Sequence, residues 1–133
     1  MQKIIEKVGL IYIQDKRLLM AKSKDSDRYY LPGGKPESGE SDKAALIREI
    51  KEELSVDVIP SSLTYLHCFY GQAHNKNQGV MVEMKCFMGK FSGVLKANAE
   101  IQTLSWFTYA DKTKGSIMAQ MVMDWLFKQK MIA

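Results

Sequence analysis

Short apolar runs separated by polar or turn-forming residues follow one another along most of the chain, and this pattern predicts strands. Residues 7–22 indicate two apolar strands around a turn near Gln14–Lys16, and residues 29–32 a short strand ended by Pro32. Further strands are expected at 56–60, 63–71, 80–91 and 102–109, with polar loops at 22–28 and 73–79.

Two other segments place apolar residues at the spacing of a helix. Residues 116–130 predict a closing amphipathic helix, whose methionines and Trp125 are expected to pack on a sheet. Residues 42–54 predict an earlier helix, with a core face made of Leu46, Ile47, Ile50 and Leu54. Many strands with one helix in the middle and one at the end predict a mixed sheet covered by helices on two faces.

The length and composition narrow the class of protein. With 133 residues, of which 46% are hydrophobic and 26% charged, we expect one folded domain spanning residues 1–133. No apolar run approaches the roughly 18 residues of a membrane span, and residues 1–13 lack the cleavage site of a signal peptide. Cys68 and Cys86 stand in apolar surroundings and are expected to be buried, reduced thiols. Together these features predict a cytoplasmic protein that makes no membrane contact.

The charge of the chain bears on its partners. The formal net charge is +4, and no block of five like charges occurs. A charge of this size would help to hold a polyanion, but it does not resemble a nucleic-acid-binding tail. Stable nucleic-acid binding is therefore not expected, and a homodimer is left open.

The helix predicted at 42–54 gathers Glu49, Glu52 and Glu53 on one face, because they are related by i, i+3 and i+4. Each like-charge pair costs about 0.2–0.5 kcal/mol in an isolated helix, and the dipole opposes acids in the last turn. A divalent cation would turn this cost into a gain, since Mg²⁺ and Mn²⁺ take hard oxygen ligands. A solvated acidic face is the alternative. The glycine turn at 33–34 and the adjacent Arg48 argue against it.

These residues resemble the Nudix box, whose pattern is G-x5-E-x7-R-E-U-x-E-E-x-G-U, with U an aliphatic residue. The chain matches eight of the nine defined positions between Gly34 and Val56. Ser55 stands where the family has a glycine that would close the helix in a left-handed conformation, so strain is expected at the helix end. The resemblance implies the α/β fold of that family, an α/β/α sandwich with a mixed, curved sheet and helices on both faces.

The resemblance also implies the reaction and its cofactor. Nudix enzymes hydrolyse a nucleoside diphosphate linked to another moiety, so the substrate is expected to be a small-molecule nucleotide and the cofactor Mg²⁺ or Mn²⁺. Carried over by position, the metal ligands are Glu49, Glu52, Glu53 and a backbone carbonyl of Gly33 or Gly34.

Further roles follow from the same resemblance. Arg48 would orient the acid cluster, and Glu40 would steady the loop and the helix by accepting hydrogen bonds. Lys35, in a PGGK segment similar to the MutT-like branch, would reach a phosphate, and Tyr30 would stack on a base. The general base is left open between the box glutamates and Glu100, which precedes the strand at 102–109 and would otherwise be an auxiliary ligand.

The substrate is the least determined part of the prediction. The short chain and the PGGK segment favour a nucleoside triphosphate pyrophosphohydrolase, which releases a nucleoside monophosphate and pyrophosphate. A nucleotide-sensing or regulatory domain without catalysis, an acidic-helix interaction module and a hydrolase of another class, such as one acting on nucleotide-sugars, are the alternatives. The complete set of box acids favours catalysis over binding alone.

Overall fold

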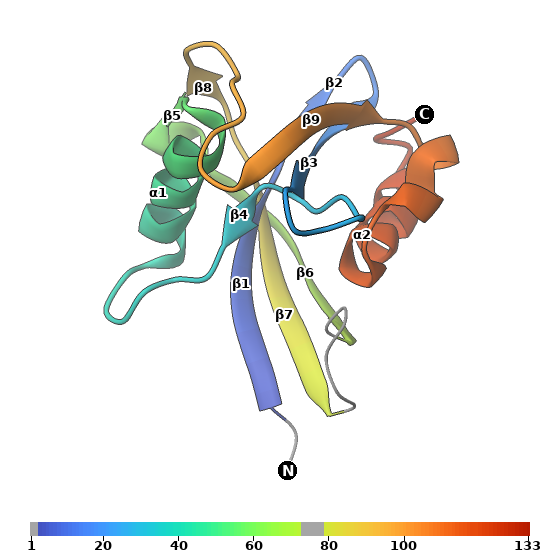
Figure 1. Ribbon diagram of the computed structural model, residues 1–133, viewed down its shortest axis with the longest axis horizontal. Helices are drawn as coiled ribbons and strands as arrows, with labels where there is room; N and C mark the ends of the chain where they lie inside the picture. The colour runs from blue at the N-terminus through green and yellow to red at the C-terminus, as the bar shows by residue number, and fades with distance from the viewer. Residues whose placement is uncertain (1–2, 73–78) are drawn as a thin grey trace.

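The computed structural model describes residues 3–72 and 79–133, which form nine strands, two α-helices and two 3-10 turns (Figure 1). Most of the loop expected at 73–79 lies outside the described residues. The strands are β1 Lys3–Ile11, β2 Ile13–Gln14, β3 Arg17–Ser23, β4 Gly33–Gly34, β5 Asp57–Val58, β6 Thr64–Gln72, β7 Val80–Met88, β8 Phe91–Ser92 and β9 Ile101–Phe107. The helices are α1 Asp42–Leu54 and α2 Ile117–Lys128, and the 3-10 turns are η1 Pro60–Ser62 and η2 Tyr109–Lys114.

The strands form two larger sheets and one short pair. The first sheet has the order β4-β1-β7-β6, in which β1 runs parallel to β7 and antiparallel to β4. The second sheet is antiparallel with the order β2-β3-β9, and β5 pairs with β8. Because parallel and antiparallel neighbours meet at β1, the first sheet is mixed, as expected from the sequence.

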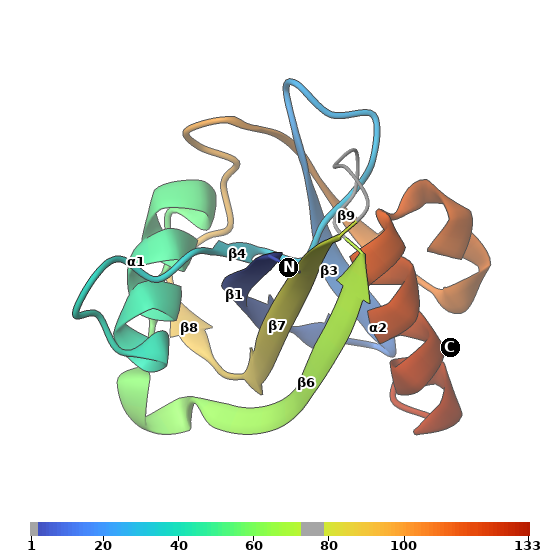
Figure 2. The same ribbon diagram turned by 90° about the horizontal axis from the view of Figure 1, so that it is seen from below.

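The two helices lie on opposite sides of the strands, α1 on the left and α2 on the right in Figure 1, and Figure 2 shows the same separation from below. Side chains of β1 alternate between two cores. Val8 and Leu10 belong to the core that contains the buried face of α1, whereas Ile11 belongs to the core under α2. Both faces of the second half of β1 are therefore covered, which explains why residues 8–11 are continuously apolar. The expected α/β architecture with helices on both faces is confirmed.

Helix α1 begins and ends where the sequence predicts. The Ser41 hydroxyl accepts a hydrogen bond from the Ala44 amide and caps the N-terminus. At the other end Ser55 adopts a left-handed conformation, with φ 63° and ψ 24°, and its amide donates to the Lys51 carbonyl. Ser55 therefore takes the left-handed conformation of the family's glycine, and the chain leaves α1 directly into Val56 and β5.

The turn expected near Gln14–Lys16 is confirmed, because it joins the paired strands β2 and β3. The first of the two apolar strands is interrupted near Tyr12, where the chain changes sheets, so that β1 and β3 lie in different sheets. Two expectations are wrong in detail. Residues 29–32 contain only isolated bridges. The strand comes after Pro32, at β4, where the glycine backbone can approach β1. Cys86 is buried, but Cys68 is only partly buried, since it lies on the edge strand β6, and both thiols are free.

No helix in the described part of the chain combines the length and the apolar character that crossing a membrane requires.

Candidate active site

The acid cluster of α1 lies beside the glycine pair of β4, and two close contacts hold the elements together. The Gly33 amide donates a hydrogen bond of 2.9 Å to Glu53 Oε1. A Cβ added to Gly34 would meet the Glu49 carboxylate, so a larger residue there would displace that side chain. Gly33 has φ 148°, and a Cβ there would overlap the Val8 carbonyl oxygen, so this position requires glycine. The two glycines thus bring the backbone of β4 against both carboxylates.

Arg48 holds the loop before α1 and the acids of α1 in one network. Its Nε and Nη2 atoms donate to the two oxygens of Glu40, each at 2.9 Å, in a bidentate pair. Nη1 donates to Glu49 at 3.0 Å and to Glu52 at 3.4 Å, and Nη2 donates to the Lys35 carbonyl at 3.2 Å. One guanidinium group therefore fixes the geometry of Glu49 relative to the loop that carries Lys35.

Glu40 completes this network on the loop side. Its Oε1 atom accepts a hydrogen bond of 2.9 Å from the Glu37 amide. The Arg48 hydrogen bonds, and then the Glu37 amide, lower the pKa of Glu40 to about 2. The same contact with Glu40 raises the pKa of Arg48. Glu40 is thus ionised and accepts bonds from both loop and helix, which is the geometry that its expected role requires.

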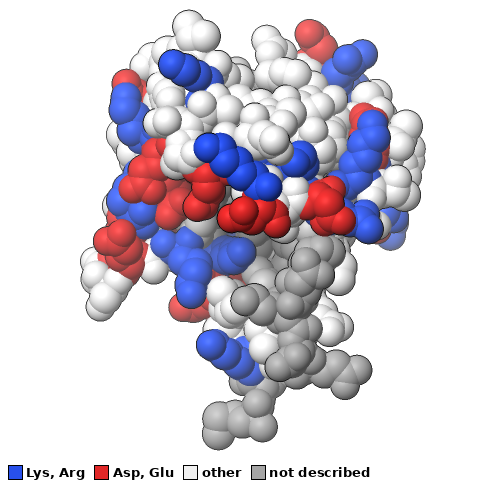
Figure 3. All heavy atoms as spheres, in the orientation of Figure 1, with Lys and Arg blue, Asp and Glu red and all other residues white. Residues whose placement is uncertain are grey.

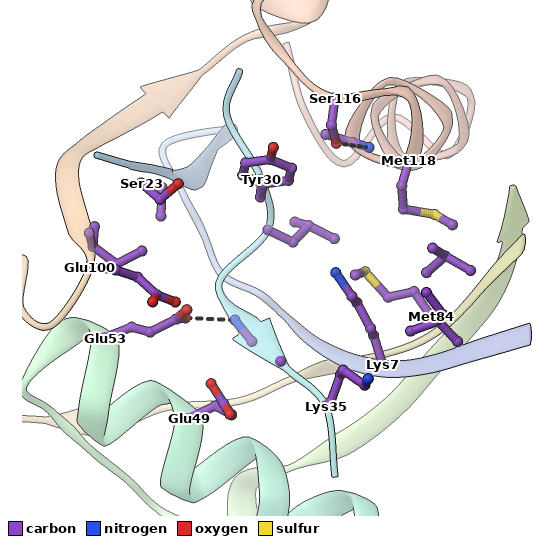
Figure 4. A pocket seen from close by; sticks show the side chains of 18 of the residues that line it. Lys7, Ser23, Tyr30, Lys35, Glu49, Glu53, Met84, Glu100, Ser116 and Met118 are labelled. Carbon is purple, nitrogen blue, oxygen red and sulfur yellow. Dashed lines mark hydrogen bonds between the residues drawn. The ribbon is translucent and has the colours of Figure 1, made fainter. Parts of the chain in front are cut away.

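A cavity of about 530 Å³ opens between α1, β1, β4 and the start of α2. Glu49, Glu53 and Glu100 line one end, where Figure 4 shows the three side chains on the same side of the Gly33–Gly34 segment. Lys7 and Lys35 also line the cavity. The remainder is largely apolar and includes Ile5, Leu31, Val82, Met84, Met118 and Ala119. The cavity therefore has an acidic end, a cationic middle and an apolar end.

The surface view shows the same separation of charge. In Figure 3, acidic side chains run in a band across the middle of this face, and basic side chains gather directly below it. Such a surface can attract a divalent cation at the band and a polyanion beside it.

The electrostatics of the acidic end favour a bound cation. Burial, followed by the nearby charges of Glu49 and Glu100, raises the pKa of Glu53 to about 8, against the lowering effect of the Gly33 amide. Burial also raises the pKa of Glu49 against the effect of Arg48. Ionising several neighbouring carboxylates costs free energy because their charges repel. A bound cation offsets this repulsion and so favours the ionised carboxylates. The donor set, all of it oxygen, fits a hard divalent ion.

A divalent ion can bind here without a complete coordination shell of protein side chains. In the ranges 3–72 and 79–133, no three His, Cys, Asp or Glu side chains already converge at distances that would hold an ion. Mg²⁺ is usually bound through one or two carboxylates, with waters and substrate phosphates completing its shell. Glu49 and Glu53 supply two such carboxylates at the cavity wall, and Glu100 lies across from them.

The structure brings most of the sequence-predicted site residues to one place. Seven of them line the cavity, and Arg48 and Glu40 lie directly behind its acidic end. Glu52 is different, because its side chain is 53% exposed and turned to Arg48 rather than toward the cavity. Its expected metal ligation would need a rotation of the side chain. The seven lining residues are Tyr30, Gly33, Gly34, Lys35, Glu49, Glu53 and Glu100.

Tyr30 lines the cavity through its ring, while its hydroxyl lies 2.8 Å from Ser26 Oγ. This contact holds the hydroxyl end of the ring in place. The neighbouring Tyr29 instead packs on Phe107, with ring centroids 4.9 Å apart. The sequence could not distinguish the two tyrosines, because adjacent residues in an extended segment point to opposite sides.

Sequence reasoning missed Lys7, Gln72 and Ser116 among the cavity residues. Lys7 interrupts an apolar strand, and this break in the hydrophobic pattern is the one signal that could have singled it out. Gln72 lies at the end of β6, and Ser116 caps α2 by accepting a hydrogen bond from Ala119. Only the tertiary arrangement places these two residues at the cavity.

Comparison with known proteins identifies a matching family and related chains. A model of the NUDIX domain family matches residues 5–125. Dihydroneopterin triphosphate diphosphatase of Escherichia coli strain K12 is 41% identical over 61 residues, which are 44% of this chain and 41% of that protein. The match therefore spans less than half of the length of this curated relative.

Solved structures resemble the whole fold. The Escherichia coli ORF135 protein superposes with a TM-score of 0.76 at 23% identity, over 97% of this chain and 92% of that chain. The MutT NUDIX hydrolase from Burkholderia pseudomallei superposes with a TM-score of 0.70 at 24% identity, over 82% of this chain and 86% of that chain. Similarity at these identities is similarity of fold.

Proposed function

The chain belongs to the NUDIX domain family, and from this premise we propose that it is a metal-dependent hydrolase of a phosphoanhydride bond in a nucleoside diphosphate derivative. The substrate that we propose is a nucleoside triphosphate, cleaved to a nucleoside monophosphate and pyrophosphate. The observation that carries the proposal is the cavity in which Glu49, Glu53 and Glu100 form one end and apolar side chains the other. These two ends suit a polyphosphate and a nucleobase of one ligand.

The relatives support the choice of a triphosphate. The curated relative is named as a diphosphatase of dihydroneopterin triphosphate, a flat ring system joined to three phosphates. The apolar end of the cavity suits a flat ring of this kind, and Tyr30 also lines the cavity. A nucleoside triphosphate combines the same two features.

Nudix hydrolases generally need divalent metal ions, and we propose Mg²⁺ or Mn²⁺ for this chain. Glu49 and Glu53 would hold the ion, together with a carbonyl of Gly33 or Gly34 and, after rotation, Glu52. When bound, the ion supplies charge neutralisation at the phosphates and lowers the pKa of a water ligand.

The residues of the chain would orient the reactants. Arg48 fixes the Glu49 carboxylate through a 3.0 Å hydrogen bond, and the Gly33 amide fixes Glu53. Hydrolysis also needs a carboxylate that takes a proton from the attacking water in line with the leaving phosphate. The candidates are Glu49, Glu52 and Glu100, and we favour a glutamate of α1, with Glu100 as an auxiliary ligand.

A panel of nucleotides tests the proposal. The protein would be incubated with each nucleoside triphosphate and Mg²⁺, and the products separated by chromatography. We expect pyrophosphate and nucleoside monophosphate, and no product from the Glu53→Gln variant. Release of inorganic phosphate alone would contradict the proposed bond, and binding without any product would indicate a nucleotide-sensing domain. Cleavage of nucleotide-sugars in preference to triphosphates would replace the proposed substrate class.

A further inference from the structure

Lys7 is a charged residue at the cavity wall to which the proposed function assigns no role. It belongs to β1, where it shares a face of the strand with Ile5 and Gly9, and its side chain is partly buried. Figure 4 shows Lys7 extending from β1 into the cavity, on the far side of the Gly33–Gly34 segment from Glu49 and Glu53. Among the described residues that line the cavity, Lys7 and Lys35 are the two positive charges.

The strand register places these two lysines together. Strand β1 pairs with β4 so that Val8 lies opposite Gly34 and Gly9 opposite Gly33. Lys7 precedes Val8 and Lys35 follows Gly34, so the two lysines flank the last pair of this register, and both line the cavity. Two ammonium groups on one cavity wall are placed to attract the oxygens of a single polyanion.

We propose that Lys7 is a second phosphate-binding lysine, which forms with Lys35 a cationic pair for the polyphosphate chain of the substrate. The inference rests on the proposed function, because it concerns how the same cavity holds its ligand. The pair would bind phosphate oxygens on the side away from Glu49 and Glu53. The polyphosphate would then lie between two cationic walls, one of them supplied by the metal ion that the glutamates hold.

The chemistry of the lysine side chain suits this role. An ammonium group has three hydrogen-bond donors and no acceptor, so it serves phosphate oxygens from a single position. Lys7 lies opposite Met84 in the pairing of β1 with β7, and both residues line the cavity. Because Lys7 is partly buried whereas Lys35 is exposed, solvent screens the charge of Lys7 less.

Binding of inorganic tripolyphosphate tests this pair without requiring catalysis. Isothermal titration of the whole protein in Mg²⁺ would compare wild type with Lys7→Met, Lys7→Arg and Lys3→Met. Removing one charge-assisted hydrogen bond should weaken binding roughly ten- to hundredfold in Lys7→Met. Lys7→Arg should retain most of the affinity. Lys3→Met removes the same charge from the same strand but outside the cavity lining, and should bind as wild type.

Kinetics would then separate phosphate binding from base recognition. Lys7→Met should raise KM by a similar factor for GTP, ATP, UTP and CTP, because the polyphosphate is common to all four. Unchanged tripolyphosphate binding in Lys7→Met, or a changed preference among the four bases, would overturn the assignment. Melting curves of both Lys7 variants verify that each is folded. A wild-type protein that binds tripolyphosphate but cleaves no nucleotide would refute the proposed function and leave the phosphate site standing.

Discussion

At the scale of single residues, Ser55 shows how a local departure from a family pattern is accommodated. It ends α1 with φ 63°, a conformation that costs an L-residue with a Cβ roughly 1 kcal/mol or more. Its amide still closes the helix by donating to Lys51, so the backbone path is that of a glycine cap. The serine therefore alters the energy of the helix end and not its geometry.

Replacing Ser55 by glycine should stabilise the protein by a few tenths to about 1 kcal/mol, because glycine adopts this conformation without strain. The free energy of unfolding from urea denaturation measures the change. Ser61→Gly is the matched control, since Ser61 is exposed and is not among the residues with positive φ. That substitution should leave stability unchanged or lower it. A loss of stability in Ser55→Gly would mean that the serine hydroxyl makes a necessary bond.

Glu100 raises a second question at the residue scale, because it lines the cavity from the loop before β9, opposite the acids of α1. We expect Glu100→Gln to lower kcat by less than about tenfold and to keep the acidic limb of the pH profile, since a glutamate of α1 is our favoured base. Steady-state kinetics between acidic and neutral pH tests this. A fall in kcat of roughly 10²–10⁴ with loss of that limb would make Glu100 the base instead.

At the scale of elements, the junction between the β4 loop and α1 depends on Arg48. The guanidinium group joins Glu40 from the loop to Glu49 from the helix, and also holds the Lys35 carbonyl. The apolar face of α1 fixes the helix on the sheet, whereas Arg48 fixes the loop on the helix. Losing Arg48 should therefore affect the position of the site more than the presence of the helix.

The Glu40–Arg48 pair gives stability a defined pH dependence. The folded pKa of Glu40 is lowered to about 2, so its contribution is fully present above the unfolded pKa and is lost as pH falls. Wild type should exceed Glu40→Gln in stability at pH 7, and this difference should shrink between about pH 5 and pH 2. Urea midpoints at several pH values measure it. A difference that stays constant over this range would show that ionised Glu40 does not stabilise the fold.

At the scale of the whole molecule, the cavity lies between α1, β1, β4 and the start of α2. Helix α1 contributes the acids, β1 and the loop after β4 contribute lysines, and α2 closes the apolar end with Met118. Glu53 is the point at which fold stability and metal binding conflict. The folded structure raises the pKa of Glu53 to about 8 and so disfavours its ionised form. Without metal, this carboxylate therefore lowers the stability of the fold increasingly as pH rises from the unfolded pKa toward 8.

Substituting Glu53 should therefore separate stability from metal binding. In the absence of metal at pH 8, Glu53→Gln should be as stable as wild type or more stable, because glutamine carries no charge into this site. Millimolar Mg²⁺ should raise the melting temperature of wild type, since the ion binds the native state, and should not raise that of the variant. Equal shifts in both proteins, measured by calorimetry, would refute Glu53 as a ligand.

The sequence by itself determined the two helices, most strands and the acids of the site. The period of the hydrophobic positions distinguishes a helix from a strand, because it follows the buried face of each element. Glu49 and Glu53 are four residues apart, so they lie on one face of α1. The bounds of residues 42–54 agree with α1, and the left-handed Ser55 was expected from the missing glycine.

Only the tertiary structure decided the sheet partners of the strands and the far wall of the cavity. An apolar strand covered on both faces carries no signal that identifies its neighbours, so the separation of β1 from β3 could not be read from residues 7–22. Lys7 and Glu100 reach the same cavity from distant segments, which sequence spacing cannot relate. The pairing of β1 with β4 and the position of β9 bring them there, because long-range contacts arise only when the sheets assemble.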